Sequence, residues 1–159
     1  VKHLFDHPEA SRRMAAGLAH ALLREFDVAA RYKQKREDAK ESKPVKGEIV
    51  LNTVTHGAFP ESLFKYALVV KRSDGTRVEG LDNPLTEEFG GLIQPNESLS
   101  LDVIDPAAIP EEIPVRFEQP RLVGSQAFVS LVKMRELDQH YQEFMEQDRQ
   151  DGTLIEPKK

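Results

Sequence analysis

The chain has 159 residues, 39% of them hydrophobic, and a net charge of -5 at pH 7, which is enough for one ordinary domain that folds without a disulfide or a metal. It contains no cysteine, which excludes a disulfide scaffold, a cysteine zinc site, an iron–sulfur cluster and a thiol nucleophile but leaves the redox compartment open. Its apolar runs are too short to span a membrane, and its acidic balance argues against a dedicated nucleic-acid binder. We therefore expect no nucleic-acid partner and no cofactor.

The charge is divided unevenly along the chain. Residues 1–46 carry a net charge of +4 and residues 47–159 carry -9, so a mildly basic N-terminal third precedes an acidic body. The chain opens with Val1 rather than Met. We expect that a leader, an anchor or a tag was removed or lies outside this chain, and that any membrane contact is made through such a segment.

A long helix is predicted for residues 8–41. Asp6 followed by Glu9 fits a capping box, and Pro8 suits the first helical turn. An apolar stripe recurs every four residues and consists of Met14, Leu18, Leu22 and Phe26. The stripe fades after Phe26, and the polar stretch Arg31–Lys46 fits either a solvated extension of the helix or a linker.

Residues 47–133 change to the two-residue period of strands. The pattern predicts a strand over Glu48–Val54 and a clearer one over Leu63–Lys71, where Phe64, Tyr66, Leu68 and Val70 would share a face. A turn at residues 73–76 then leads into a partner strand over Arg77–Gly80.

Further strands are predicted toward the C-terminal end of this region. A turn at residues 94–97 leads into the alternating residues 99–103, and residues 113–117 alternate around Pro114, which indicates an edge or a strand end. The last strand would place Ala127, Val129 and Leu131 on one face. Six or seven short strands separated by turns favour an antiparallel sandwich.

A second amphipathic helix is predicted from about Met134, and Gly152 ends it. Its apolar stripe consists of Leu137, Tyr141, Phe144 and Met145.

Three stretches resemble bacterial extracytoplasmic immunoglobulin-like domains of the FxLYD kind. They are 46–53, a first strand; 66–75, a hydrophobic strand that runs into an Asp-Gly turn; and 92–98, a turn before the next strand. The resemblance covers residues 47–104. It departs from the family at Asn96, where glycine is usual, and in the longer loop Leu81–Gly91. It implies a non-catalytic module, often near a membrane anchor, and brings no catalytic residues.

The combined prediction is an α+β chain, an immunoglobulin-like antiparallel β-sandwich flanked by N-terminal and C-terminal amphipathic helices. Its predicted parts are a helical arm with a basic spacer over residues 1–42, the sandwich over 43–133, and the C-terminal helix and tail over 134–159.

The five histidines do not form a recognisable catalytic or metal pattern. His3 and His7 stand four residues apart, as a metal pair on a helix requires, but a third ligand is not evident and a frayed chain end is the competing interpretation. His20 is expected to face solvent or an interface. His56 and His140, like the others, have no serine or cysteine partner at a known spacing, although a triad is defined in space.

Paired carboxylates are predicted in two loops. Glu87-Glu88 and Glu111-Glu112 could serve acid–base hydrolysis or, with Asp82 and Asp105, a weak calcium site. No EF-hand spacing is present, and solvated surface carboxylates are the competing interpretation.

The loop Leu85–Leu92 contains Phe89 and Gly90-Gly91 but lacks the lysine and hydroxyl ending of a phosphate loop. It fits a partner-contact loop as well as a flexible turn with Phe89 on the core. The basic stretch Arg31–Lys46 could meet anionic lipid or nucleic acid, but Tyr32 is its only aromatic residue, so a solvated spacer is the competing interpretation.

Two apolar helix faces must still be covered, by each other, by the sheet or by another chain, because exposing them would cost several kcal/mol at about 25 cal/mol per Å2. We therefore predict a non-enzymatic interaction or assembly module, such as an accessory subunit of a cell-envelope complex, with the envelope or periplasm favoured over the cytoplasm. Its contacts to a protein partner or a second copy would be made by the 81–92 loop and both helices, through Met14, Leu18, Leu22, Phe26, Phe89, Leu137, Tyr141 and Phe144.

Two other function classes stay open. One is a small-ligand or carbohydrate-binding sandwich, with Phe59, Phe89 and loop carboxylates at its site. The other is a hydrolase that uses the loop carboxylates.

Overall fold

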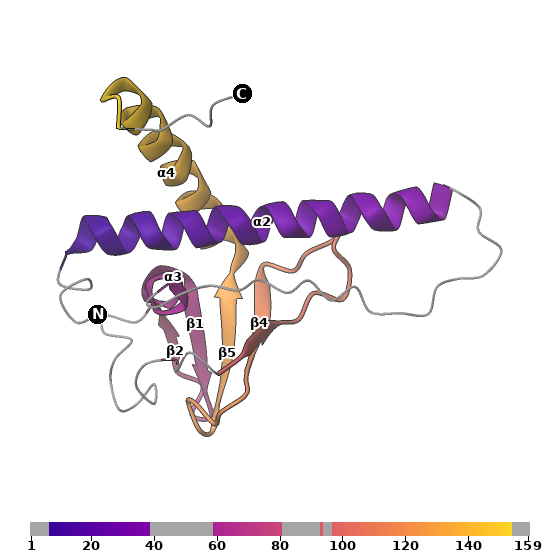
Figure 1. The fold of residues 1–159 in the computed structure, drawn as a ribbon. Helices are drawn as coiled ribbons and strands as arrows, with labels where there is room; N and C mark the ends of the chain where they lie inside the picture. Colours follow the sequence, from indigo (N-terminus) through magenta and orange to yellow (C-terminus); the bar gives the residue numbers. More distant parts are fainter. Residues whose placement is uncertain (1–6, 39–58, 81–92, 94–96, 154–159) are drawn as a thin grey trace.

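The chain is α+β, with helices on an antiparallel sheet (Figure 1). The structure, a computed structural model, describes residues 7–38, 59–80, 93 and 97–153. The described helices are α2 (Pro8–Asp38), α3 (Phe59–Ala67) and α4 (Leu131–Gln150). The described strands are β1 (Leu68–Arg72), β2 (Arg77–Glu79), β3 (Leu99–Leu101), β4 (Glu112–Phe117) and β5 (Ser125–Ser130).

The described strands form a single open sheet in the order β2-β1-β5-β4-β3, and each pair is antiparallel. Val70, at the middle of β1, is opposite Val78 on one side and Ala127 on the other. The strand predicted for 48–54 and the loop 81–92 lie outside the described residues. The antiparallel sheet is thus confirmed, and its extension to an immunoglobulin-like sandwich stays a prediction.

One face of the sheet is apolar and packs against the helices, because alternate residues of neighbouring strands point to the same side. Its buried side chains are Leu68, Val70, Ile113, Val115 and Val129. The opposite face carries charge, since Glu112 accepts hydrogen bonds from Lys71 and Arg77, which lower the pKa of its carboxyl. Glu112 therefore belongs to β4 and to a surface ion cluster, not to a loop as predicted.

The clearest predicted strand, Leu63–Lys71, is wrong over its first half, which is helix α3 as far as Ala67. Pro60 lies in the first turn of this helix, where a missing N–H costs nothing. Leu63 and Ala67 are one helical turn apart, and both are buried. The sequence of this segment fits both the alternation of a strand and the spacing of a helix. Packing of α3 on α2 selects the helix.

The predicted hairpin after β1 is confirmed. Gly75 N–H donates to Arg72 O at 3.0 Å within the turn, and Gly80 N–H donates to Leu68 O at 2.7 Å. Gly80 has φ +70°, and a Cβ atom there would lie 2.6 Å from the carbonyl oxygen of Lys65. Only glycine fits this close approach of β2 to the end of α3.

Two strand boundaries were also predicted wrongly. Pro114 does not mark an edge, because β4 lies between β5 and β3. The Pro114 carbonyl accepts a hydrogen bond from Asp102 N–H at 3.0 Å, and Asp102 lies just past the end of β3. Proline has no N–H to donate in return, and it is tolerated here because the pairing of β3 with β4 ends at this position. Leu131 does not end a strand but begins α4, where the Ser130 side chain caps the helix by accepting from Lys133 N–H.

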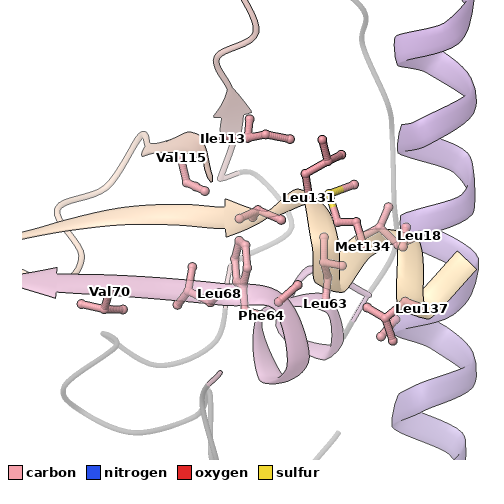
Figure 2. Close-up of a cluster of buried hydrophobic side chains, with 14 of the residues drawn as sticks. Leu18, Leu63, Phe64, Leu68, Val70, Ile113, Val115, Leu131, Met134 and Leu137 are labelled. Atoms are coloured by element: carbon pink, nitrogen blue, oxygen red, sulfur yellow. The ribbon is translucent and has the colours of Figure 1, made fainter. Parts of the chain in front are cut away.

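The hydrophobic core lies where α2, α3 and α4 meet the apolar face of the sheet. Figure 2 shows Leu18 of α2, Leu63 of α3 and Met134 of α4 gathered at this junction, and all three are buried. Close approach of the helices is possible because the α2 residues at the contact are small: Ala15, Ala16 and Ala19 are 0% exposed. The core thus draws on residues from all three predicted parts of the chain.

Helix packing on α2 generates a prediction about two neighbouring small residues. Ala19→Leu adds bulk at a fully buried contact and should lower the free energy of unfolding by about 1–3 kcal/mol. Gly17→Ala should raise it by about 0.5–1 kcal/mol, because alanine is the better helix former and a Cβ atom at Gly17 meets nothing within 4 Å. Urea unfolding measures both values. Equal effects of the two substitutions would contradict close packing at Ala19.

Candidate functional site

The two amphipathic helices cover each other within the chain, which is one of the three possibilities left open by the sequence. Leu18, Phe26 and Leu137 are buried in the core. The other predicted contact residues of these helices are half-buried: Met14, Leu22, Tyr141 and Phe144. Phe89 lies outside the described residues. The predicted role of these side chains toward a partner stays a prediction. Within the chain, the three buried ones belong to the shared core and Leu22 packs against it.

Two polar pairs set the orientation of α4 across α2. Arg13 Nη1 donates to both carboxylate oxygens of Asp148 at 3.0 Å, which raises the pKa of the guanidinium, and Arg13 lies over the Phe144 ring at 4.5 Å. Nearer the start of α4, His20 Nδ1 is 2.7 Å from Asp138 Oδ1, and the imidazole stacks on Tyr141. The helices are therefore antiparallel, and His20 lies in the contact between them.

The C-terminal half of α2 presents an outward face that neither α3 nor α4 covers (Figure 1). We name it the cationic stripe, and it consists of Arg24, Val28, Arg31 and Lys35. These residues follow one another at four- and three-residue steps, so they line one side of the helix. Val28 is 59% exposed and the neighbouring Tyr32 is 52% exposed. Arg24, Arg31 and Lys35 have no ion pair or hydrogen bond to the described residues.

The outward face of α4 has the opposite charge. We name it the acidic stripe, and it consists of Glu136, Gln139, Glu143 and Glu146, all exposed. These residues also follow one another at three- and four-residue steps. Glu136 and Glu143 contact only α4 neighbours within the described chain, Lys133 and His140 respectively. The stripe lies opposite the buried side of α4, which carries Met134 and Leu137.

A group of charged side chains is buried under the N-terminal end of α3. Arg121 donates through Nε and Nη2 to the two carboxylate oxygens of Glu97 at 2.7 and 2.6 Å, and both side chains are only 4% exposed. Nearby, Glu61 is 0% exposed. Its Oε1 accepts from Ile93 N–H at 2.8 Å, whereas its Oε2 has no hydrogen-bond partner among the described residues.

Burial raises the pKa of Glu61 above the ordinary value of glutamate, and the negative charge of Glu97 adds to this effect. Hydrogen bonds from its own and the Ile93 backbone N–H, and the positive charge of Arg121, act in the other direction. The folded protein holds the Glu61 proton more tightly than the unfolded chain does. Protonation of Glu61 therefore contributes fully to the free energy of unfolding below the unfolded pKa of about 4.3, and this contribution is lost as the pH rises through the folded pKa.

This pKa shift predicts how stability depends on pH. Glu61→Gln removes the ionisation and keeps an acceptor for Ile93, so its free energy of unfolding relative to the natural chain should rise steadily from acid to alkaline pH. Urea titrations at pH 4, 6 and 8 test this. If the difference in the free energy of unfolding between the two proteins is the same at all three pH values, ionisation of Glu61 does not destabilise the folded chain.

The matched change at Glu97 should act in the opposite direction. Glu97→Gln removes the carboxylate that accepts two hydrogen bonds from the buried Arg121 guanidinium and should cost about 3–5 kcal/mol of stability. The same urea titrations measure it. A loss below about 1 kcal/mol would show that the ion pair is accessible to water.

The remaining predicted chemical groups serve the fold or face solvent. Lys33 Nζ donates to Asp105 Oδ1 at 2.9 Å, which lowers the pKa of Asp105 and ties α2 to the segment before β4. His7 and Glu111 are exposed, and the predicted residues His3, His56, Asp82 and Glu87-Glu88 lie outside the described residues. Across the described chain, no three histidine or acidic side chains could together hold a metal ion.

One shallow hollow has a volume of about 280 Å3, and its walls include Val115, Phe117, Arg121 and Ala127. Phe59, predicted to line a ligand site, packs partly buried against the core at the start of α3, and its predicted role stays a prediction. None of the described helices is long and apolar enough to cross a membrane.

Sequence reasoning missed the buried group of Glu61, Glu97 and Arg121. A signal was present, since Glu61 interrupts the apolar run around Phe59 and Leu63. Glu61 lies just before the segment predicted as a strand, and no role was predicted for it. No family model, curated protein or solved structure matches the chain.

Proposed function

We propose that the chain is a non-enzymatic protein-interaction or assembly module, and that the cationic stripe of α2 is its contact surface. The main support is that the three cations of the stripe, which have no ion pair or hydrogen bond to the described residues, lie beside the exposed Val28 on one face of a 31-residue helix. The opposite face of the same helix is fixed to the fold by Phe26, Ala29 and the Lys33–Asp105 ion pair. The stripe is therefore held rigidly and presented outward.

The composition of this surface supports binding to another macromolecule. A single exposed apolar residue is ordinary on a protein surface. Here Val28 and Tyr32 lie one helical turn apart among arginines, and arginine and tyrosine are enriched at protein interfaces. A rigid helix face binds with a smaller loss of conformational freedom than a loop does.

The absence of enzymatic activity is part of the proposal. His20 and His140 pair with carboxylates, and no hydroxyl group is hydrogen-bonded to an imidazole in the described part of the chain. Placement in a cell-envelope complex, and completion of the sheet to an immunoglobulin-like sandwich, both rest on the resemblance over residues 47–104. The sandwich also needs the strand predicted for residues 48–54.

Substitutions in the stripe test the proposal. Val28→Glu with Tyr32→Ser should abolish co-elution of the chain with its protein partner in native purification from the source organism, while the melting temperature stays unchanged. The matched control is Val123→Glu, which introduces the same charge at an equally apolar, 89% exposed position outside α2. Co-elution that survives the double variant, or is lost equally in the control, would contradict the proposed surface.

A second function is favoured by the shallow hollow whose walls include Val115, Phe117 and Ala127. This chemistry suits a small ligand that has an apolar body, the alternative predicted from the sequence. A ligand present at 100 times its dissociation constant stabilises the folded chain by about 2.7 kcal/mol. A thermal-shift screen of carbohydrates and small acids should then give a hit that Phe117→Ala abolishes, and a screen without hits removes this alternative.

A further inference from the structure

We infer that the cationic stripe of one copy of this chain docks on the acidic stripe of a second copy. This inference rests on the proposed function, because it names the partner of the surface proposed there. The two stripes have opposite charge, lie on rigid helices and are both exposed. The chain itself therefore carries the complement of its own cationic surface.

The spacing of the charges matches along the two helices. The cationic stripe places charges at Arg24, Arg31 and Lys35, and the acidic stripe places them at Glu136, Glu143 and Glu146. In each set two of the charges are seven residues apart, and the third follows three or four residues later. Steps of three and four residues are the spacing at which two helices pack side by side. Val28 and Val132, both about half exposed, lie within these faces and supply apolar contact.

The contact proposed between copies repeats chemistry that the chain already uses internally. Basic residues of α2 bind acidic residues of α4 in the same chain, as Arg13 does with Asp148 and His20 with Asp138. These pairs occupy the N-terminal half of α2 and the inward side of α4. The stripes continue the same arrangement on the surfaces that the internal contact leaves exposed, with α2 providing cations and α4 providing carboxylates.

The acidic stripe loses little when it exchanges its internal partners. Glu136 with Lys133 and Glu143 with His140 are pairs three residues apart on the helix surface, and their side chains are 41–69% exposed. Exposed pairs of this kind contribute little stability. An arginine-rich surface that removes water from Val28 and Val132 offers these carboxylates stronger, bidentate partners.

The first measurement is the mass of the full chain in solution by sedimentation or light scattering over a range of concentration and salt. The inference predicts concentration-dependent association, with a dissociation constant that rises at least about tenfold from 50 to 500 mM salt. Arg31→Glu should weaken it, whereas the matched Arg12→Glu, at an exposed cation on another face of α2, should not. A monomer at every concentration in low salt overturns the inference.

A charge exchange separates this contact from any other self-association. The variant Arg24→Glu, Arg31→Glu, Lys35→Glu and the variant Glu136→Lys, Glu143→Lys, Glu146→Lys should each be monomeric at low salt. Mixed together, they should associate again. The first variant then has two acidic stripes and the second has two basic stripes, so each α2 stripe again faces an α4 stripe of opposite charge. Association of either variant alone with unchanged affinity, or failure of the natural chain to pair with itself, overturns the inference.

The two proposals fail in distinguishable ways. A natural chain that is monomeric alone, but co-elutes with a different protein through Val28 and Tyr32, overturns the second-copy partner and leaves the proposed interaction function standing. Circular dichroism and unchanged melting temperatures show that the variants fold. If a triple variant unfolds, the single changes Arg31→Gln and Glu143→Gln replace it, and each should weaken association.

Discussion

The close packing of α2 on α3 and α4 is the contact on which the rest of the structure depends. It is possible because Ala15, Ala16 and Ala19 bring no bulk to the contact and are fully buried. Leucine, phenylalanine and methionine side chains from α3, α4 and the sheet fill the space around them. This packing covers the apolar faces of both amphipathic helices, positions α4 antiparallel to α2, and fixes which sides of the two helices remain outward.

The outward sides have charge patterns that the core packing does not need. Within the helix pair, Arg13 and His20 of α2 pair with carboxylates of α4, so complementary charge orients the two helices. Beyond that pair, the cationic stripe on α2 and the acidic stripe on α4 have no tertiary partner among the described residues. The proposed assembly function follows from these two stripes, and it requires no rearrangement of the fold.

Much of the fold could be predicted from the sequence, because period and turn chemistry are local. The helix from Pro8, the hairpin around Gly75 and the amphipathic α4 all follow from patterns within a few residues. The failures arise where two patterns coexist. Residues 63–67 fit both a strand and a helix, and only contact with α2 selects the helix. Pro114 suggested an edge because the sequence does not show that the adjacent ladder ends at Asp102.

The candidate site was predictable only in part. The sequence identified both amphipathic helices, but it directed attention to their apolar faces, which the chain covers itself. From the sequence, the outward charges are indistinguishable from ordinary solvated residues, and only the packing shows which of them lack a tertiary partner in the described part of the chain. Hydrogen exchange of the full chain, measured by mass spectrometry at low and high protein concentration, tests the central claim most directly. The account predicts that protection rises with concentration in residues 24–35 and 132–147 together; unchanged exchange in both segments, or new protection confined to other parts of the chain, would contradict it.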